Sequence, residues 1–386
     1  MISPTAPGDR IESIDAIRGM ALFGVLIVNL VTAFRVSIFQ QFVGTPPSAI
    51  DFPDAAVERI VALGFEEKAF SLFALLFGAG LAMQFDRLSA LGIPLYWLAR
   101  RLGVLLILGL IHLLLVWNGD ILTEYALAGL VALPFLFLRS AGLLLAAFAF
   151  LLLYVAGPLL YSVPWPDATA LQRHVASANH VYATGNLAEI WRFSLQELPL
   201  MFSLHVFVFP RTLALFVFGM FLWRAGIVQR AHHFAEELFV AAFVGIASGI
   251  ALAGAQGPFG SLGIVLLALG YGAALLALAE VSITRRFFSA FAPIGRMAFT
   301  NYVMQSVFFG FIFFGYGLGQ FGRMGAAMAF AIGMAVYVAQ FALSSWWLRR
   351  YRFGPIEWLW RTLTYGANQP MRAAASDKEH HRAESF

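Results

Sequence analysis

The sequence contains no cysteine, which excludes disulfides, thiolate metal ligands and a cysteine nucleophile. Charged residues are also scarce, at 12% of the 386 residues, whereas 60% are hydrophobic. An average soluble domain carries about 25% charged residues, so this composition excludes an ordinary soluble globule and indicates a polytopic membrane protein. The sequence has no HExxH or CxxC motif and no carboxylate-rich spacing typical of a metal site, so we expect no metal.

The chain also lacks a concentrated basic patch, although its net charge is +4. The basic residues are scattered at the ends of apolar runs, which the positive-inside rule explains better than nucleic-acid binding does. We therefore expect membrane lipids, and no nucleic acid, around this protein. The first apolar run, residues 14–34, is too long for the core of a signal peptide and follows acidic residues, so we interpret it as a retained span.

Successive hydrophobic windows predict about ten transmembrane helices. Backbone exposed to lipid must satisfy its own hydrogen bonds, so these spans predict an all-α polytopic helix bundle, a single membrane domain over residues 1–365. The second and third runs are short for a full crossing. The ten runs cover residues 14–34, 69–85, 102–118, 121–138, 141–161, 200–223, 234–255, 261–279, 294–315 and 324–348.

Basic residues are distributed unequally between the two sides of this predicted bundle. With the N-terminus inside, 18 of the 25 Lys and Arg residues are cytoplasmic, which predicts that both termini are cytoplasmic. Two long outer loops follow, near residues 36–68 and 162–198, and they are either covers over the outer mouth or simple connectors. Residues 366–386 form a polar segment that we predict to be a disordered cytoplasmic tail.

The most informative run begins at the basic pair Arg100-Arg101, contains His112, and ends at Trp117-Asn-Gly-Asp120. At about 1.5 Å per residue, His112 lies roughly 16 Å along a helix from Arg101, near the middle of the hydrocarbon core. An ionisable group at that depth is a functional-site hypothesis by default. The alternative is a neutral imidazole that hydrogen bonds to a neighbouring helix.

Several motifs occur in a fixed order along the chain and together resemble the YeiB family of bacterial inner-membrane proteins. They begin with Asp15-Ala-Ile-Arg18-Gly19 and Asn29, and continue with Lys68-Ala-Phe-Ser-Leu-Phe and Phe77-Gly78-Ala-Gly80, the run from Arg101 to Asp120, Gly295-Arg-Met-Ala-Phe-Thr-Asn301-Tyr-Val-Met-Gln305, and Gly354-Pro-Ile-Glu-Trp-Leu-Trp-Arg361. The resemblance covers about residues 10–364 and implies a ten-helix protein of the bacterial inner membrane. The family in turn resembles the transmembrane acyltransferases, which include heparan-α-glucosaminide N-acetyltransferase and take acyl groups from cytoplasmic acyl-CoA.

This second resemblance implies roles for particular residues. Asn29 matches the site asparagine of the lysosomal enzyme, but the histidine that follows it there has no counterpart in residues 30–41. The spacing from Arg101 to His112 is similar to that of another membrane acyltransferase family, whose histidine is taken to be catalytic. Either His112 supplies the histidine from another helix, or this chain performs different chemistry.

The chemistry of imidazole is compatible with His112 supplying the catalytic histidine from another helix. Imidazole can act as a base or carry an acyl group, so His112 is the candidate catalytic residue, with Asn29 to stabilise the reacting carbonyl and Asp120 near the acceptor. Arg100 and Arg101 would bind the phosphates of an acyl-CoA donor, although both are also ordinary inside anchors. Candidate acceptor-binding residues are Lys68 and Trp117 at the outer end, and Asn301 and Gln305 on the ninth span, for which interhelical hydrogen bonding is an adequate alternative.

The leading hypothesis is therefore an acyltransferase, with His112 as base or acyl carrier and a small-molecule acceptor. The alternative is a transporter of a small amphipathic solute. Glycine-rich runs such as Phe77-Gly78-Ala-Gly80 and Gly315-Tyr-Gly-Leu-Gly319 permit either close helix packing or discontinuous helices. A haem or quinone site that pairs His112 with His205 lacks a supporting spacing pattern. The acyl group, the acceptor and a homodimer are left open.

Overall fold

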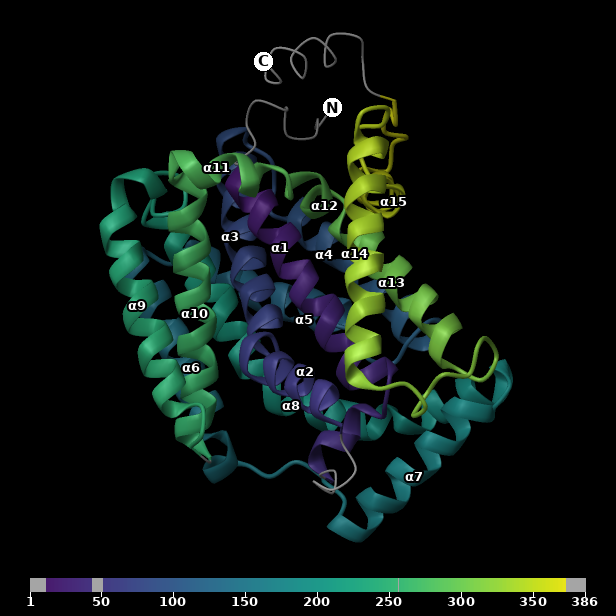
Figure 1. Ribbon diagram of the computed structural model, residues 1–386. Coiled ribbons are helices and arrows are strands. Elements are labelled where there is room, and N and C mark those ends of the chain that lie inside the picture. Colours follow the sequence, from purple (N-terminus) through teal and green to yellow (C-terminus); the bar gives the residue numbers. More distant parts are fainter. Residues whose placement is uncertain (1–11, 44–50, 256, 373–386) are drawn as a thin grey trace.

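The fold is built from helices (Figure 1), and a computed structural model describes residues 12–43, 51–255 and 257–372. These residues form no β-strand and only an isolated bridge between Tyr351 and Arg372. The helices are α1 Glu12–Asn29, α2 Phe52–Gly64, α3 Lys68–Ala90, α4 Tyr96–Leu115, α5 Leu122–Ala132, α6 Ser140–Leu160, α7 Ala168–Thr184, α8 Leu187–Arg224, α9 Ala235–Leu252, α10 Pro258–Glu280, α11 Ser282–Ser289, α12 Ala292–Arg296, α13 Ala298–Phe313, α14 Ala326–Leu348 and α15 Pro355–Tyr365. Short π or 3-10 segments are η2 Leu30–Phe34, η3 Ile38–Phe42, η5 Leu133–Phe137 and η6 Ala231–Phe234. The all-α prediction is confirmed.

Seven helical segments among the described residues are long and apolar enough to cross a membrane. They are α1 with η2, α4, α6, α8, η6 with α9, α10 and α14. Two shorter apolar helices cover Leu122–Phe137 and Ala298–Phe313, and α3 covers the remaining predicted run. Each of the ten runs therefore forms a helix, and the polytopic bundle is confirmed. The two shorter apolar helices are interrupted by local breaks. Pro134 lies in the 3-10 segment that follows α5, and Met297 separates α13 from α12.

Several helices extend beyond the hydrophobic windows. Helix α4 begins at Tyr96, so Arg100 and Arg101 lie within it rather than before it. Helix α8 begins at Leu187, where Asn186 and Glu189 form a capping box that satisfies the first backbone amides. The segment 162–198 is thus largely helical, and the segment 36–68 contains η3 and α2. Residues 44–50 of that segment lie outside the described residues.

Glycines allow α1 to lie against α12. A Cβ atom on Gly19 would come within 2.4 Å of the Phe291 carbonyl oxygen, and one on Gly295 would come within 1.8 Å of the Asp15 carbonyl oxygen. A larger residue at either position would separate the two backbones. The glycines of the first and ninth apolar runs therefore position the two helices that form one wall of the site described below.

Helix α3 packs in the same way against α8. A Cβ atom on Gly78 would lie 2.0 Å from the Phe216 carbonyl oxygen, and α3 is continuous through this position. Gly78 therefore belongs to a close helix crossing, and residues 77–80 lie within a continuous helix rather than a discontinuous one. Gly319 has a φ of +61° and lies in the turn after α13, where the absence of a Cβ removes the steric penalty.

The described chain begins and ends at the same end of the bundle (Figure 1). The starts of α1 and α4 lie there with α11, α12 and α15, and α7 lies at the opposite end. We call these the basic end and the α7 end. Residues 366–372 of the predicted tail pack on the preceding segment, because Arg352 donates to the Met371 carbonyl at 2.9 Å and Trp358 to the Gln369 carbonyl at 2.8 Å. Residues 373–386 lie outside the described residues.

Candidate functional site

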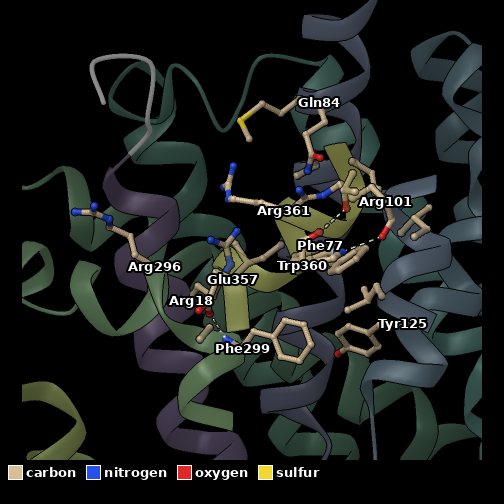
Figure 2. Close-up of a pocket in the computed structure, with 18 of the residues that line it drawn as sticks. Arg18, Phe77, Gln84, Arg101, Tyr125, Arg296, Phe299, Glu357, Trp360 and Arg361 are labelled. Carbon is tan, nitrogen blue, oxygen red and sulfur yellow. Dashed lines mark hydrogen bonds between the residues drawn. The ribbon is translucent and has the colours of Figure 1, made fainter. Parts of the chain in front are cut away.

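A cavity of about 330 Å³ extends into the bundle from its basic end. Helices α1, α3, α4, α5, α13 and α15 line it, together with the α12 segment (Figure 2). Residues such as Arg87 and Trp97 lie at the basic end, whereas Ile121, Leu122 and Tyr302 lie deeper. The cavity thus joins surface-proximal charge to an apolar interior, the usual composition of a ligand site.

Arginines dominate the charge of this cavity. Six of them line it: Arg18, Arg87, Arg101, Arg296, Arg352 and Arg361. The carboxylates of the lining are Asp15, which pairs with Arg18 at 2.7 Å, and Glu357. Guanidinium groups bind phosphate through two parallel hydrogen bonds, so the excess of arginine favours an anionic and, above all, a phosphorylated ligand.

Glu357 is held by the start of α13. Its carboxylate accepts hydrogen bonds from the Phe299 amide at 2.8 Å, the Thr300 amide at 3.0 Å and the Thr300 hydroxyl at 2.5 Å. Burial raises the pKa of the Glu357 carboxyl, and the hydrogen bonds from Thr300 and Phe299 oppose that rise. The carboxylate also sits where the helix dipole is positive, so it fixes α15 against α13.

The fold places only one member of the predicted basic pair, Arg100 and Arg101, in the cavity lining. The Arg101 guanidinium lies over the Trp360 ring at 3.8 Å and lines the cavity, and the Trp360 indole donates to the Arg101 carbonyl at 2.9 Å. Arg100 instead donates to the Leu363 carbonyl at 3.1 Å and is not part of the lining. Neighbours on a helix point about 100° apart, so only one member of the pair can face the cavity.

His112 and Asp120 form a buried pair beyond the cavity. His112 Nδ1 lies 2.9 Å from Asp120 Oδ1, and the two residues are only 3% and 1% exposed. The second carboxylate oxygen accepts from the Thr123 amide at 2.7 Å at the start of α5. An ionised carboxylate can only accept, so Nδ1 donates to Asp120, and an imidazole protonated at Nδ1 alone carries its lone pair at Nε2. That Nε2 atom is buried and has no hydrogen-bond partner among the described residues.

Close packing of α4 and α5 brings the pair together. A Cβ atom on Gly109 would lie 2.7 Å from the Thr123 amide nitrogen, so the two helices approach at that point. The turn between α4 and α5 brings Asp120 next to His112, which lies eight residues earlier in the chain. Tyr302 then connects the pair to the cavity, because it lines the cavity and its ring centroid is 5.2 Å from that of His112.

Two further histidine–carboxylate pairs were not predicted. His205 Nδ1 lies 2.5 Å from Glu124, which also accepts from the Thr212 hydroxyl. His174 lies 2.9 Å from Glu197, to which Asn118 and Tyr182 also donate. Burial raises the pKa of the Tyr182 phenol well above its usual value. Glu124 and His205 are 81 residues apart, so spacing alone could not identify this pair.

The remaining predicted site residues lie apart from the cavity. Asn29 is buried at the junction of α1 and η2, and among the described residues it makes no hydrogen bond to His112 or Asp120. Lys68 donates to the Ala62 carbonyl at 2.8 Å and joins α2 to α3. Trp117 stacks on Phe34, with 4.3 Å between ring centroids, and contributes to a small space at the α7 side of the turn.

Asn301 and Gln305 face α14. Asn301 donates to the Ser344 hydroxyl at 3.0 Å, and Gln305 donates to Gln340 at 2.8 Å. Gln340 in turn donates to the Asn301 carbonyl. These contacts match interhelical hydrogen bonding, the alternative to substrate binding. No group of three or more potential metal ligands occurs within the parts of the chain that the structure describes.

Comparison with known proteins identifies relatives over nearly the full chain. The family model described as "Protein of unknown function (DUF418)" matches residues 222–367, which contain the α12, α13 and α15 walls of the cavity. The chain is 33% identical over 395 residues to the uncharacterized protein YxaH of Bacillus subtilis, covering 96% of this chain and 98% of that protein. It is 29% identical over 399 residues to the uncharacterized protein YeiB of Escherichia coli, covering 94% and 98%.

Proposed function

Since the chain belongs to the YeiB family, we propose from its own site that it is an integral membrane acyltransferase. Acyl-coenzyme A would bind in the basic cavity and pass its acyl group to a small-molecule acceptor at the His112–Asp120 pair. One observation carries this proposal: a buried, carboxylate-oriented histidine lies directly behind Tyr302, which lines a cavity that six arginines also line.

The cavity supports a coenzyme A thioester as donor. The diphosphate and the 3′-phosphate of coenzyme A are polyanionic, which suits guanidinium groups. Trp97 and Tyr365 at the basic end offer aromatic surface to a purine. The deeper lining is apolar, with Leu102, Leu105 and Phe299, and would surround a pantetheine arm that extends toward Tyr302.

The His112–Asp120 pair supports acyl transfer chemistry. Asp120 orients the imidazole and stabilises the imidazolium that forms when Nε2 accepts a proton from the acceptor hydroxyl or amine. The acceptor atom bonds to the thioester carbon, the carbon–sulfur bond breaks, and His112 returns the proton to the coenzyme A thiolate. Direct attack by Nε2 would give an acyl-histidine, which the acceptor would then cleave.

We place the basic end in the cytoplasm of a bacterium and the bundle in its inner membrane. The excess of Lys and Arg at that end supports this orientation. Acyl-CoA is a cytoplasmic metabolite, so the same orientation gives the donor access to the cavity.

The donor site is tested by coenzyme A binding to purified protein in nanodiscs, measured by calorimetry. Arg101→Ala should weaken binding by about 1 to 3 kcal/mol, the range for a charge-assisted hydrogen bond, and Arg101→Lys should restore only part of it. Arg100→Ala is the matched control, because it removes the adjacent arginine, which lies outside the lining. We expect that variant to bind like the unaltered protein.

Equal losses in Arg100→Ala and Arg101→Ala would contradict the donor site and indicate a general effect of charge. Turnover is measured as thiol release from acetyl-CoA and octanoyl-CoA. Binding without any thiol release, combined with uptake of an amphipathic solute into proteoliposomes, would favour a transporter instead.

A further inference from the structure

Tyr302 lines the cavity and also contacts the His112 ring. It lies on α13, is 4% exposed, and contributes to the deep end of the cavity lining. Its ring is tilted by 42° to the His112 ring, with 5.2 Å between the centroids. A thioester that reaches the end of the cavity would therefore meet Tyr302 beside the imidazole.

The Tyr302 hydroxyl accepts a hydrogen bond within the protein but does not donate one to any described residue. The Ile121 amide donates to its oxygen at 3.3 Å. No described residue accepts the hydroxyl proton of Tyr302. A phenol has one proton to donate, so this proton is available to a group that enters the cavity.

Tyr125 provides an internal comparison. It lines the same cavity and is 5% exposed, but its hydroxyl donates to the Phe70 carbonyl at 2.5 Å. The proton of this second phenol is thus already engaged. Of these two buried tyrosines, Tyr302 is the one that can donate to a ligand without breaking a protein hydrogen bond.

We propose that Tyr302 is a catalytic residue whose hydroxyl donates a hydrogen bond to the carbonyl oxygen of the bound thioester. This inference rests on the proposed acyltransferase function. When the acceptor attacks the carbonyl carbon, the π electrons of the carbonyl move to its oxygen, and the Tyr302 hydroxyl stabilises the resulting oxyanion. Collapse of this intermediate restores the carbonyl and expels the coenzyme A thiolate, which takes the proton held on His112 Nε2.

The surrounding structure holds Tyr302 ready for this role. The Ile121 amide fixes the phenol oxygen, and the preceding residues Phe299 and Thr300 are held by the Glu357 carboxylate. A donor fixed before the reaction needs no reorganisation when charge develops, which is the condition for effective oxyanion stabilisation. Ile121 directly follows Asp120, so the same turn positions the base and the donor.

The test compares Tyr302→Phe with the control Tyr337→Phe, because Tyr337 is also buried, donates its hydroxyl proton to the Gly19 carbonyl at 2.9 Å and does not line the cavity. Purified protein in nanodiscs is given acetyl-CoA, with water as the acceptor, and coenzyme A release is followed with a thiol reagent. The chain has no cysteine, so every thiol detected comes from the substrate. Tyr302→Phe should lower kcat by about 100- to 1,000-fold, the range for losing one oxyanion donor, while KM stays within about twofold. Tyr337→Phe should keep kcat within about threefold, which corresponds to less than about 1 kcal/mol in the barrier.

A second measurement separates a donor from a ring that only supports packing. Fluorinated tyrosines at position 302 make the phenol progressively more acidic at nearly constant shape. The rate should vary with phenol acidity if the hydroxyl donates to the oxyanion, and should be constant if the ring alone matters.

The outcomes distinguish this inference from the proposed function. Unchanged kcat in Tyr302→Phe, equal losses in the two Phe variants, or a rate independent of phenol acidity would overturn the role of Tyr302 and leave the acyltransferase proposal standing. Failure of the unaltered protein to release thiol from acetyl-CoA or octanoyl-CoA would overturn both.

Discussion

His112 differs from the other paired histidines in how it is buried. The side chains of His174 and His205 are 24% and 30% exposed beside their carboxylates, whereas that of His112 is 3% exposed beside a fully buried Asp120. Its Nε2 atom is also buried without a partner in the described chain. An unsatisfied buried polar atom costs about 1 to 3 kcal/mol, and proteins retain such costs most often at functional sites.

Replacing His112 by glutamine tests its chemical role. The glutamine amide can still donate to Asp120, but it cannot accept a proton and release it again. We expect His112→Gln to bind coenzyme A and melt like the unaltered protein, while thiol release from acetyl-CoA falls at least about 100-fold. His205→Gln makes the same change in a pair outside the cavity lining and should retain thiol release. Full activity of folded His112→Gln would refute the mechanism.

Sequence reasoning identified the candidate residues His112, Asp120 and Arg101 but not what joins them. Eight residues separate His112 from Asp120, and a turn that returns the chain is foreseeable from Asn-Gly-Asp. Tyr302 and Trp360 come from 190 and 259 residues beyond His112 and Arg101, so only tertiary packing brings them near. The sequence could not separate Arg100 from Arg101 either, because the phase of α4 relative to its neighbours was unknown.

At the scale of elements, hydrophobicity predicted which segments are helical but not how they end. The apolar run 294–315 divides into α12 and α13, and the carboxylate that holds the start of α13 comes from α15. Likewise, polar residues within an apolar span indicate a partner without identifying it. Asn301 and Gln305 find theirs on α14, through Ser344 and Gln340.

The junction of α13 and α15 can be tested through the Thr300 hydroxyl, which donates to Glu357 and accepts from the Ile356 amide at 3.1 Å. Thr300→Val keeps the shape but removes the hydroxyl partner of Glu357 Oε2 and of the Ile356 amide, so we expect a loss of about 1 to 3 kcal/mol in the free energy of unfolding, measured by denaturant titration. Thr362→Val on α15 is the control, since no described residue pairs with its buried hydroxyl, and it should be neutral. Equal effects would show that the Thr300 hydrogen bonds contribute nothing specific.

At the scale of the whole molecule, basic residues are distributed unequally between the two ends of the bundle. The predicted inner side carries 18 of the 25 Lys and Arg residues, and the cavity arginines lie at that end. The same asymmetry supports both the predicted orientation in the membrane and the proposed binding of an anionic donor. The opposite end is covered by α7 and the start of α8, where the buried Glu197 pairs with the partly exposed His174.

This orientation determines which face of the membrane the cavity meets, and the cysteine-free chain makes it measurable. Ser177 on α7 and Ser89 at the end of α3 are exposed at opposite ends of the bundle. In intact cells, an impermeant maleimide should label Ser177→Cys, whereas Ser89→Cys should react only after permeabilisation. The unaltered chain, which has no thiol, is the control. The reverse pattern would place the arginine cavity outside, where cytoplasmic acyl-CoA cannot reach it, and would remove the donor from the proposed reaction.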